Sequence, residues 1–186
     1  HICLLTLSAA GAPDLAKRIV EMLTRSGLPA RSDDRRGFDH GVFIPFKLIF
    51  PDADIPIVQV SLHKGLDPTL HLDAGRALTP LRQEGVLIVG SGMSYHNMRG
   101  FGDPRARHDS DTFDAWLTEA LTQTNAESRD TALKNWASAP AARAAHPREE
   151  HLIPLMVAAG AGGEEPGTKI FTDHPMETTV SAFRFG

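Results

Sequence analysis

The segment LIVGSGMSYHNMRG, residues 87–100, ends an apolar run on two glycines and then presents a histidine and an asparagine. Glycine lets a backbone turn sharply or lets a ligand approach it closely. An imidazole in a crevice beyond such a turn can move a proton near neutral pH, so His96 is a candidate acid–base residue. The amide of Asn97 could hold its own loop or orient a neighbour. A glycine-rich turn with an incidental histidine is the commoner origin of this pattern, and the glycine spacing matches neither a phosphate loop nor a dinucleotide-binding turn.

A second group of candidate residues lies in HPREEHLIPL, residues 146–155. Carboxylate and imidazole side chains are both good ligands for first-row metal ions, which makes Glu150 and His151 candidates for a metal site. His146 and His151 are five positions apart and do not share a helical face well, so we expect only one of them to point into a site. The alternative is an ordinary helix start, with Glu149 and Glu150 placed favourably for the helix dipole.

A third histidine, His40, lies in GFDHGVF, residues 37–43. Taken alone, a histidine between an aspartate and a glycine is more often an ordinary loop residue than part of a site. Four other histidines lie in polar surroundings and are expected to be solvated: His63, His71, His108 and His174.

Hydrophobic periodicity and turn residues indicate the elements that would position these side chains. We expect helices over residues 13–26, 68–84, 111–121, 131–145 and 149–163, and strands over residues 57–62, 86–89 and within 171–186. The helix over 111–121 would be capped by Asp109, Ser110 or Asp111. Residues 40–50 are apolar around a proline and their type is ambiguous.

The alternation of these helices and strands predicts an α/β fold. We expect one domain over residues 1–186, with a central, largely parallel or mixed sheet flanked by helices. Residues 86–89 would be a strand buried on both faces, and ligands in such folds bind beyond the carboxyl ends of the strands. His96 would then lie in that crevice.

Composition excludes several classes of function. The chain has 186 residues with a net charge of −4 and no cluster of basic residues, which argues against nucleic acid as the main partner. No apolar run reaches the ~20 residues of a membrane span. The single cysteine, Cys3, is typical of a reducing compartment, so a cytoplasmic location is expected. The nine histidines are the compositional hint of metal or proton chemistry.

Four motifs in order resemble the class III extradiol ring-cleaving dioxygenases, nearest the DOPA 4,5-dioxygenase branch. They are GFDHG at 37–41, FPDADIPIVQVSL at 50–62, LIVGSGMSYHN at 87–97 and HPREEHLIPLMVAAGA at 146–161. Together they are far more specific than any one of them, and the resemblance extends from about residue 5 to the C-terminus.

The resemblance implies a role for each matching residue. His151 matches the metal ligand of the C-terminal motif, and Glu150 and His96 are weaker ligand candidates. His96 matches the acid–base histidine, and His40 a catalytic histidine that lines the substrate pocket, beside which Asn97 would also contact substrate. The metal would be Fe(II), with Zn(II) as the alternative, and the substrates a catechol-type aromatic molecule and O2. His96 would take a proton from the catechol and return it as the ring opens.

The sequence departs from the family in one respect. Two further metal histidines of the family, in HGSP-like and SAHW-like motifs, are not found, and the sequence starts with His1 at a point where the family is already past both. We expect that an N-terminal third is absent and that a partner, for instance a second copy of the chain, covers core exposed by its loss. Three hypotheses remain open: an extradiol dioxygenase, a truncated and inactive homologue, and a zinc-dependent hydrolase on a similar scaffold.

Overall fold

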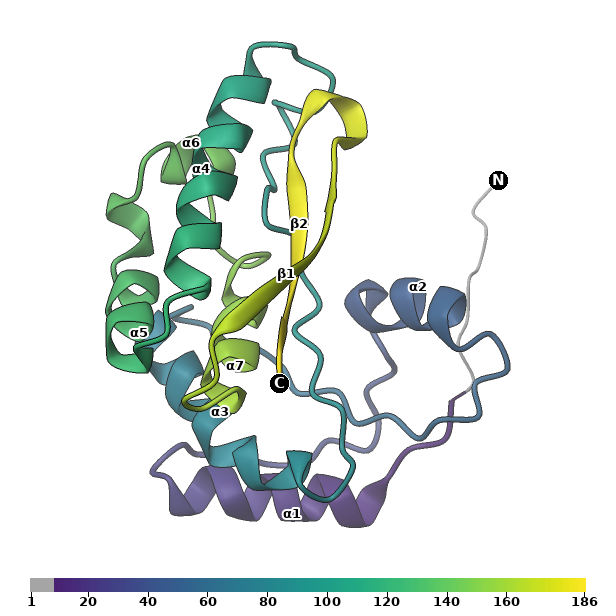
Figure 1. Cartoon of the computed structure of the whole chain (residues 1–186). Helices are drawn as coiled ribbons and strands as arrows, with labels where there is room; N and C mark the ends of the chain where they lie inside the picture. Colours follow the sequence, from purple (N-terminus) through teal and green to yellow (C-terminus); the bar gives the residue numbers. More distant parts are fainter. Residues whose placement is uncertain (1–8) are drawn as a thin grey trace. The chain divides into compact units, whose positions relative to one another are not determined.

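The computed structural model describes residues 9–186, which form helices joined by long extended segments and one small sheet near the C-terminus (Figure 1). The chain divides into two compact units, one up to Ser61 and the other Leu62–Gly186. The candidate residues His96, Glu150 and His151 belong to the second unit, and His40 belongs to the first.

The first unit contains helices α1 (Pro13–Arg25) and α2 (His40–Ile49). The helix predicted over 13–26 is confirmed, and the ambiguous segment around residues 40–50 is a helix despite the proline inside it. Asp39 starts α2 as its N-cap, because its Oδ1 accepts a hydrogen bond of 3.1 Å from the Gly41 N–H. The helix therefore begins at His40 itself.

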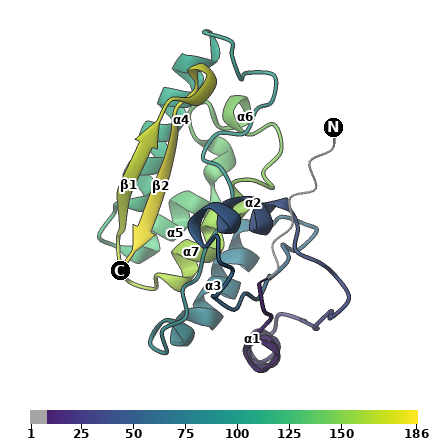
Figure 2. The same ribbon diagram turned by 90° about the vertical axis from the view of Figure 1, so that its right-hand side faces the viewer.

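The second unit is mostly helical. Its elements in chain order are α3 (Pro68–Arg82), α4 (Ala106–Leu121), α5 (Ala126–Lys134), α6 (Ala142–Ala145), α7 (Ile153–Ala161), β1 (Gly167–Asp173) and β2 (Val180–Phe185), with single 3-10 turns at Trp136–Ser138 and Pro175–Glu177. Strands β1 and β2 form an antiparallel pair that lies along α4 (Figure 2).

Helices α3 and α7 pack with their backbones very close together. A Cβ atom added at Gly75 would lie 2.1 Å from the Val157 carbonyl oxygen, and one added at Gly160 would lie 2.1 Å from the Leu72 carbonyl oxygen. The glycine inside α3, which weakens a helix by itself, is thus required by this helix–helix contact.

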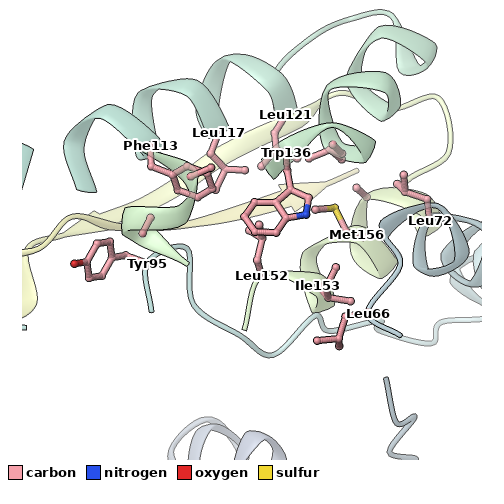
Figure 3. Close-up of a cluster of buried hydrophobic side chains, with 14 of the residues drawn as sticks. Leu66, Leu72, Tyr95, Phe113, Leu117, Leu121, Trp136, Leu152, Ile153 and Met156 are labelled. Carbon is pink, nitrogen blue, oxygen red and sulfur yellow. The ribbon is translucent and has the colours of Figure 1, made fainter. Parts of the chain in front are cut away.

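The core of the second unit lies between these helices and the sheet. Large apolar side chains from α3, α4, α7 and the connecting segments meet there, as Figure 3 shows for Leu66, Leu72, Tyr95, Phe113, Leu117, Leu121, Trp136, Leu152, Ile153 and Met156. Of the histidines expected to be solvated, His71 is instead buried at the start of α3. Its Nδ1 lies 2.5 Å from the Asp67 carbonyl oxygen, and its Nε2 accepts the His63 N–H. Burial lowers the pKa of His71.

The α/β class is correct, but the expected central sheet is not confirmed. Within residues 9–186 the strands form a single two-stranded antiparallel sheet. Residues 57–62 and 86–89 form no strand, and 75% of Leu87 and 49% of Val89 are exposed. The strand predictions for these two segments are wrong, because a strand needs, besides apolar and β-branched residues, a neighbour that supplies the ladder of hydrogen bonds.

Two helix predictions need correction. Helix α4 begins at Ala106 after Arg105, so Asp109, Ser110 and Asp111 lie within it instead of capping it. The alanine-rich stretch 131–145 is not one helix. It contains the end of α5, a 3-10 turn and α6, and Pro140 and the left-handed Ala141 (φ 57°) separate them. Among residues 9–186, no helix is both long and apolar enough to cross a membrane.

Candidate metal centre

Three of the candidate side chains meet in the second unit. His96, Glu150 and His151 each offer a ligand atom, and these atoms all lie within 4.8 Å of one another. The two imidazole rings are stacked face to face, with centroids 3.4 Å apart and planes inclined by 16°. All three residues are partly exposed.

The segment that carries His96 is held against the turn that carries His151. The Met93 N–H donates a hydrogen bond of 2.9 Å to the His151 carbonyl oxygen. A Cβ atom at Gly92 would lie 2.1 Å from that oxygen, and one at Gly90 would lie 2.4 Å from the Pro154 carbonyl oxygen. The absence of side chains at the two glycines therefore lets the backbone of residues 151–154 pack directly against this segment, and this contact brings the two histidines together.

His151 lies in the turn just before α7, not within the helix as expected. The next two residues, Leu152 and Ile153, are buried in the core and fix the turn. The Leu152 N–H also donates a hydrogen bond of 2.8 Å to the Glu149 carbonyl oxygen, which closes the turn. The sharp start of the apolar helix thus holds His151 at its N-terminal end.

The charges around Glu150 are balanced locally. Its Oε2 lies 3.3 Å from Nε of Arg148, and its Oε1 lies 3.6 Å from Nδ1 of His151. One carboxylate next to two imidazoles is a donor set that suits Fe(II) or Zn(II). The pattern in residues 146–155 predicted that only one of His146 and His151 would reach a site, and the donor group contains His151 and not His146.

His146 has a different environment. It is completely buried, and its Nε2 lies 2.9 Å from the Ser94 carbonyl oxygen. Burial lowers the pKa of His146 to about 4, so the ring is neutral over the physiological range. Sequence reasoning noticed His146 only as a ligand candidate and missed Ser94 altogether, because both act through backbone contacts that no spacing rule reveals.

Asn97 and His40 are placed as follows. Nδ2 of Asn97 donates a hydrogen bond of 2.9 Å to the Ala144 carbonyl oxygen, and its Oδ1 accepts one of 3.1 Å from the Arg99 N–H. These bonds hold its own loop, which was one of the two expected roles, and the substrate contact stays a prediction. His40 is exposed at the first residue of α2 in the other unit, and its role also stays a prediction.

Sequence reasoning also missed Gln59, which fixes the start of α2. The Asp39 N–H donates a hydrogen bond of 3.1 Å to Oε1 of Gln59, and Nε2 of Gln59 donates one of 2.6 Å to Oδ2 of Asp39. This reciprocal pair ties the extended segment at residues 57–61 to the residue before His40. It could not have been found from the sequence, since the two residues are far apart along the chain.

Comparison with known protein families gives this geometry a context. Residues 2–184 match the model of the catalytic LigB subunit of aromatic ring-opening dioxygenases. The chain belongs to the LigB family. The match covers nearly the whole sequence, including all the residues of the candidate metal centre.

Curated LigB relatives include several named dioxygenases. The chain is 44% identical over 164 residues to the 4,5-DOPA dioxygenase extradiol of Beta vulgaris, a match that covers 84% of this chain and 59% of that protein. It is 34% identical over 165 residues to the 4,5-DOPA dioxygenase extradiol of Escherichia coli, over 86% of this chain and 60% of that protein. The chain therefore spans about three fifths of the length of these relatives.

A solved structure has the same fold. The crystal structure of an uncharacterized protein from Escherichia coli K12 superposes with a TM-score of 0.81 at 30% identity, over 100% of this chain and 77% of that one. The family resemblance expected from the four motifs is therefore confirmed.

Proposed function

We propose that this chain carries the metal and acid–base residues of an extradiol dioxygenase, which opens the ring of a catechol-type aromatic molecule with O2. The observation that carries the proposal is the meeting of His96 with Glu150 and His151 in a chain that matches the LigB family over residues 2–184. The names of the curated relatives point to the same reaction class and to a dihydroxyphenyl substrate.

The donor set fits the metal that this chemistry needs. His151 would hold the ion, and Glu150 is the carboxylate next to it that could serve as a further ligand. An imidazole and a carboxylate are ligands that suit Fe(II), and Zn(II) is the alternative that the same atoms would accept. When bound, the metal would polarise the catechol oxygens and act as a template that brings the ring and O2 together.

His96 is proposed to be the proton carrier. Its ring is stacked on that of His151, so a substrate hydroxyl held near a metal on His151 would be within its reach. A neutral imidazole there can accept the hydroxyl proton and return it when the ring opens. The loop bonds of Asn97 keep this segment in place, while His40 is proposed to form a further contact with the substrate.

The direct test is oxygen uptake by the full-length protein, loaded anaerobically with Fe(II) and mixed with a dihydroxyphenyl substrate such as DOPA. We expect uptake of one O2 per catechol and, with isotopically labelled oxygen, both labelled atoms in the ring-opened product. We expect His96→Ala to lower the turnover rate by roughly two orders of magnitude. Absence of uptake in wild-type protein shown to contain iron would overturn the proposal.

A zinc-dependent hydrolase is the competing function, because two histidines and one glutamate are also a common catalytic zinc set. Protein loaded with Zn(II) and assayed on a panel of esters and amides separates the two. Hydrolysis without any oxygen uptake on catechols would favour the hydrolase.

A further inference from the structure

The loop that carries His96 is clamped by a short segment at the end of α6. The His96 N–H donates 3.0 Å to the Ala145 carbonyl oxygen, and Asn97 donates from its amide to the Ala144 carbonyl oxygen. The third bond of the clamp is the contact between the His146 ring and the Ser94 carbonyl oxygen. Two of the three bonds use backbone atoms of the 144–145 segment, and only the third depends on a particular ring.

The protonation of His146 follows from its surroundings. The ring is fully buried and touches the edges of Phe113 and Trp136, with centroid distances of 5.3 and 6.1 Å. A neutral imidazole carries one N–H, and the Ser94 carbonyl oxygen can only accept a hydrogen bond. The proton is therefore on Nε2, which donates 2.9 Å to Ser94, and Nδ1 has no hydrogen-bond partner.

A buried imidazole with only one of its two nitrogens hydrogen-bonded is not explained by stability alone. A buried nitrogen without a partner costs free energy, and an apolar side chain of similar size would fill the same space without that cost. What an apolar side chain could not supply is the hydrogen bond to Ser94, two residues before His96.

Ser94 connects this loop to the rest of the second unit. Its carbonyl oxygen accepts from His146, and its Oγ accepts a hydrogen bond of 2.8 Å from the Ser181 N–H of β2. Met93, the preceding residue, is bonded to the His151 carbonyl oxygen. Hydrogen bonds from three parts of the second unit thus hold the His96 loop, and on the α6 side the His146 ring bonds the Ser94 carbonyl oxygen.

We propose that His146 is a positioning residue of the candidate site: its Nε2–H holds the Ser94 carbonyl so that the His96 ring stays stacked on His151. This inference rests on the proposed function for its catalytic consequence, and its structural part can be tested without metal or substrate. His146 itself is not in the donor group, so it acts only through the loop.

The test compares His146→Leu, which removes the donor, with His146→Gln, whose amide nitrogen lies near the position of Nε2 and can donate to the same carbonyl. In metal-free protein we expect the His96 amide hydrogen to exchange about ten-fold faster in His146→Leu than in wild type, and to recover in His146→Gln. The NMR signals of the His96 ring, which depend on the stacked His151 ring, should move in His146→Leu and return in His146→Gln.

A matched control separates positioning from general loosening of the core. Leu133 is fully buried in α5 and forms none of the three hydrogen bonds of the clamp, so Leu133→Ala opens a cavity in the same core and leaves these bonds intact. We expect this control to speed exchange throughout the unit without a selective effect at His96, and to leave the His96 ring signals in place. An equal selective effect at His96 in Leu133→Ala, or no recovery in His146→Gln, would overturn the inference.

The catalytic consequence is measured in the iron-loaded protein. His146→Leu should lower kcat at least ten-fold with little change in KM, and His146→Gln should restore most of it. If wild-type protein does not cleave catechols, the proposed function fails, while the exchange and NMR results still decide whether His146 positions His96. Unchanged exchange, ring signals and kcat in His146→Leu would contradict the proposal directly.

Discussion

Replacement of Gly92 by alanine tests how the two halves of the site are joined. The added Cβ would lie 2.1 Å from the His151 carbonyl oxygen and 3.4 Å from Cγ of Pro154. The first contact is with a backbone atom, which cannot rotate away as a side chain can. Either the His96 segment or the His151 turn must therefore move by about 1 Å before the contact becomes acceptable.

That movement should affect the site more than the stability of the protein. Overpacking of this kind costs about 1–3 kcal/mol of unfolding free energy. A displacement of about 1 Å at a site can cost about 100-fold in activity, because the ligand and the proton carrier no longer face each other. The shift also breaks the bond from the Met93 N–H to the His151 carbonyl oxygen. We expect Gly92→Ala to fold, to bind Fe(II) at least ten-fold more weakly than wild type, and to cleave catechols about 100-fold more slowly.

The assay is urea unfolding together with anaerobic Fe(II) titration and oxygen uptake. Gly11→Ala is the matched control, because a Cβ added there has no neighbour within 4 Å. The control should be neutral or slightly stabilising, since alanine reduces the freedom of the unfolded chain. If Gly92→Ala has wild-type iron affinity and an unfolding free energy within about 0.5 kcal/mol of the wild type, the close contact described here is wrong.

Three further predictions concern the structures that support the site. Because the pKa of His146 is about 4 in the folded protein and near its ordinary 6.5 when unfolded, the unfolded state binds more protons between these values. The contribution of His146 to the unfolding free energy should therefore be complete above pH 6.5, and the unfolding free energy should fall by about 3 kcal/mol as the pH drops towards 4. Urea titrations of His146→Gln should lack this pH dependence, and an identical dependence in the variant would contradict the prediction. Asp39→Ala should lower the unfolding free energy by about 1 kcal/mol in urea titration because α2 loses its cap, whereas Asp39→Asn should retain most of it; equal losses would argue against the cap. Arg129→Met should cost about 2–4 kcal/mol by the same measurement, because buried Asp130 keeps Arg76 but loses Arg129, and the Gly163 and Glu165 carbonyl oxygens lose their donors; a cost below about 1 kcal/mol would refute the role of this buried pair.

Local elements were predictable from the sequence where the signals were local. The proline and aspartate before an apolar stripe located α1, and the strand after residue 171 was found because alternation is visible within a few residues. The sequence also singled out His96 and His151, which the structure brings together, since a histidine after a glycine turn and one at the start of an apolar helix are both visible patterns.

The relations between distant segments could not be predicted from local patterns. Residues 86–89 have the composition of a buried strand, yet Leu87 is largely exposed, because the pairing of a strand depends on other segments. Gly92 was understood as a place for a turn or a ligand, but the atom that approaches it is the carbonyl oxygen of His151. The bonds from His146 to Ser94 and from Asp39 to Gln59 likewise join residues whose spacing carries no signal.

Anaerobic Fe(II) titration of the full-length protein and two single variants tests the central claim most directly. If His151 holds the metal and His96 carries the proton, His151→Ala should lose at least 100-fold in iron affinity, while His96→Ala should keep its affinity within about ten-fold and lose turnover. Wild-type iron affinity in His151→Ala would contradict the account.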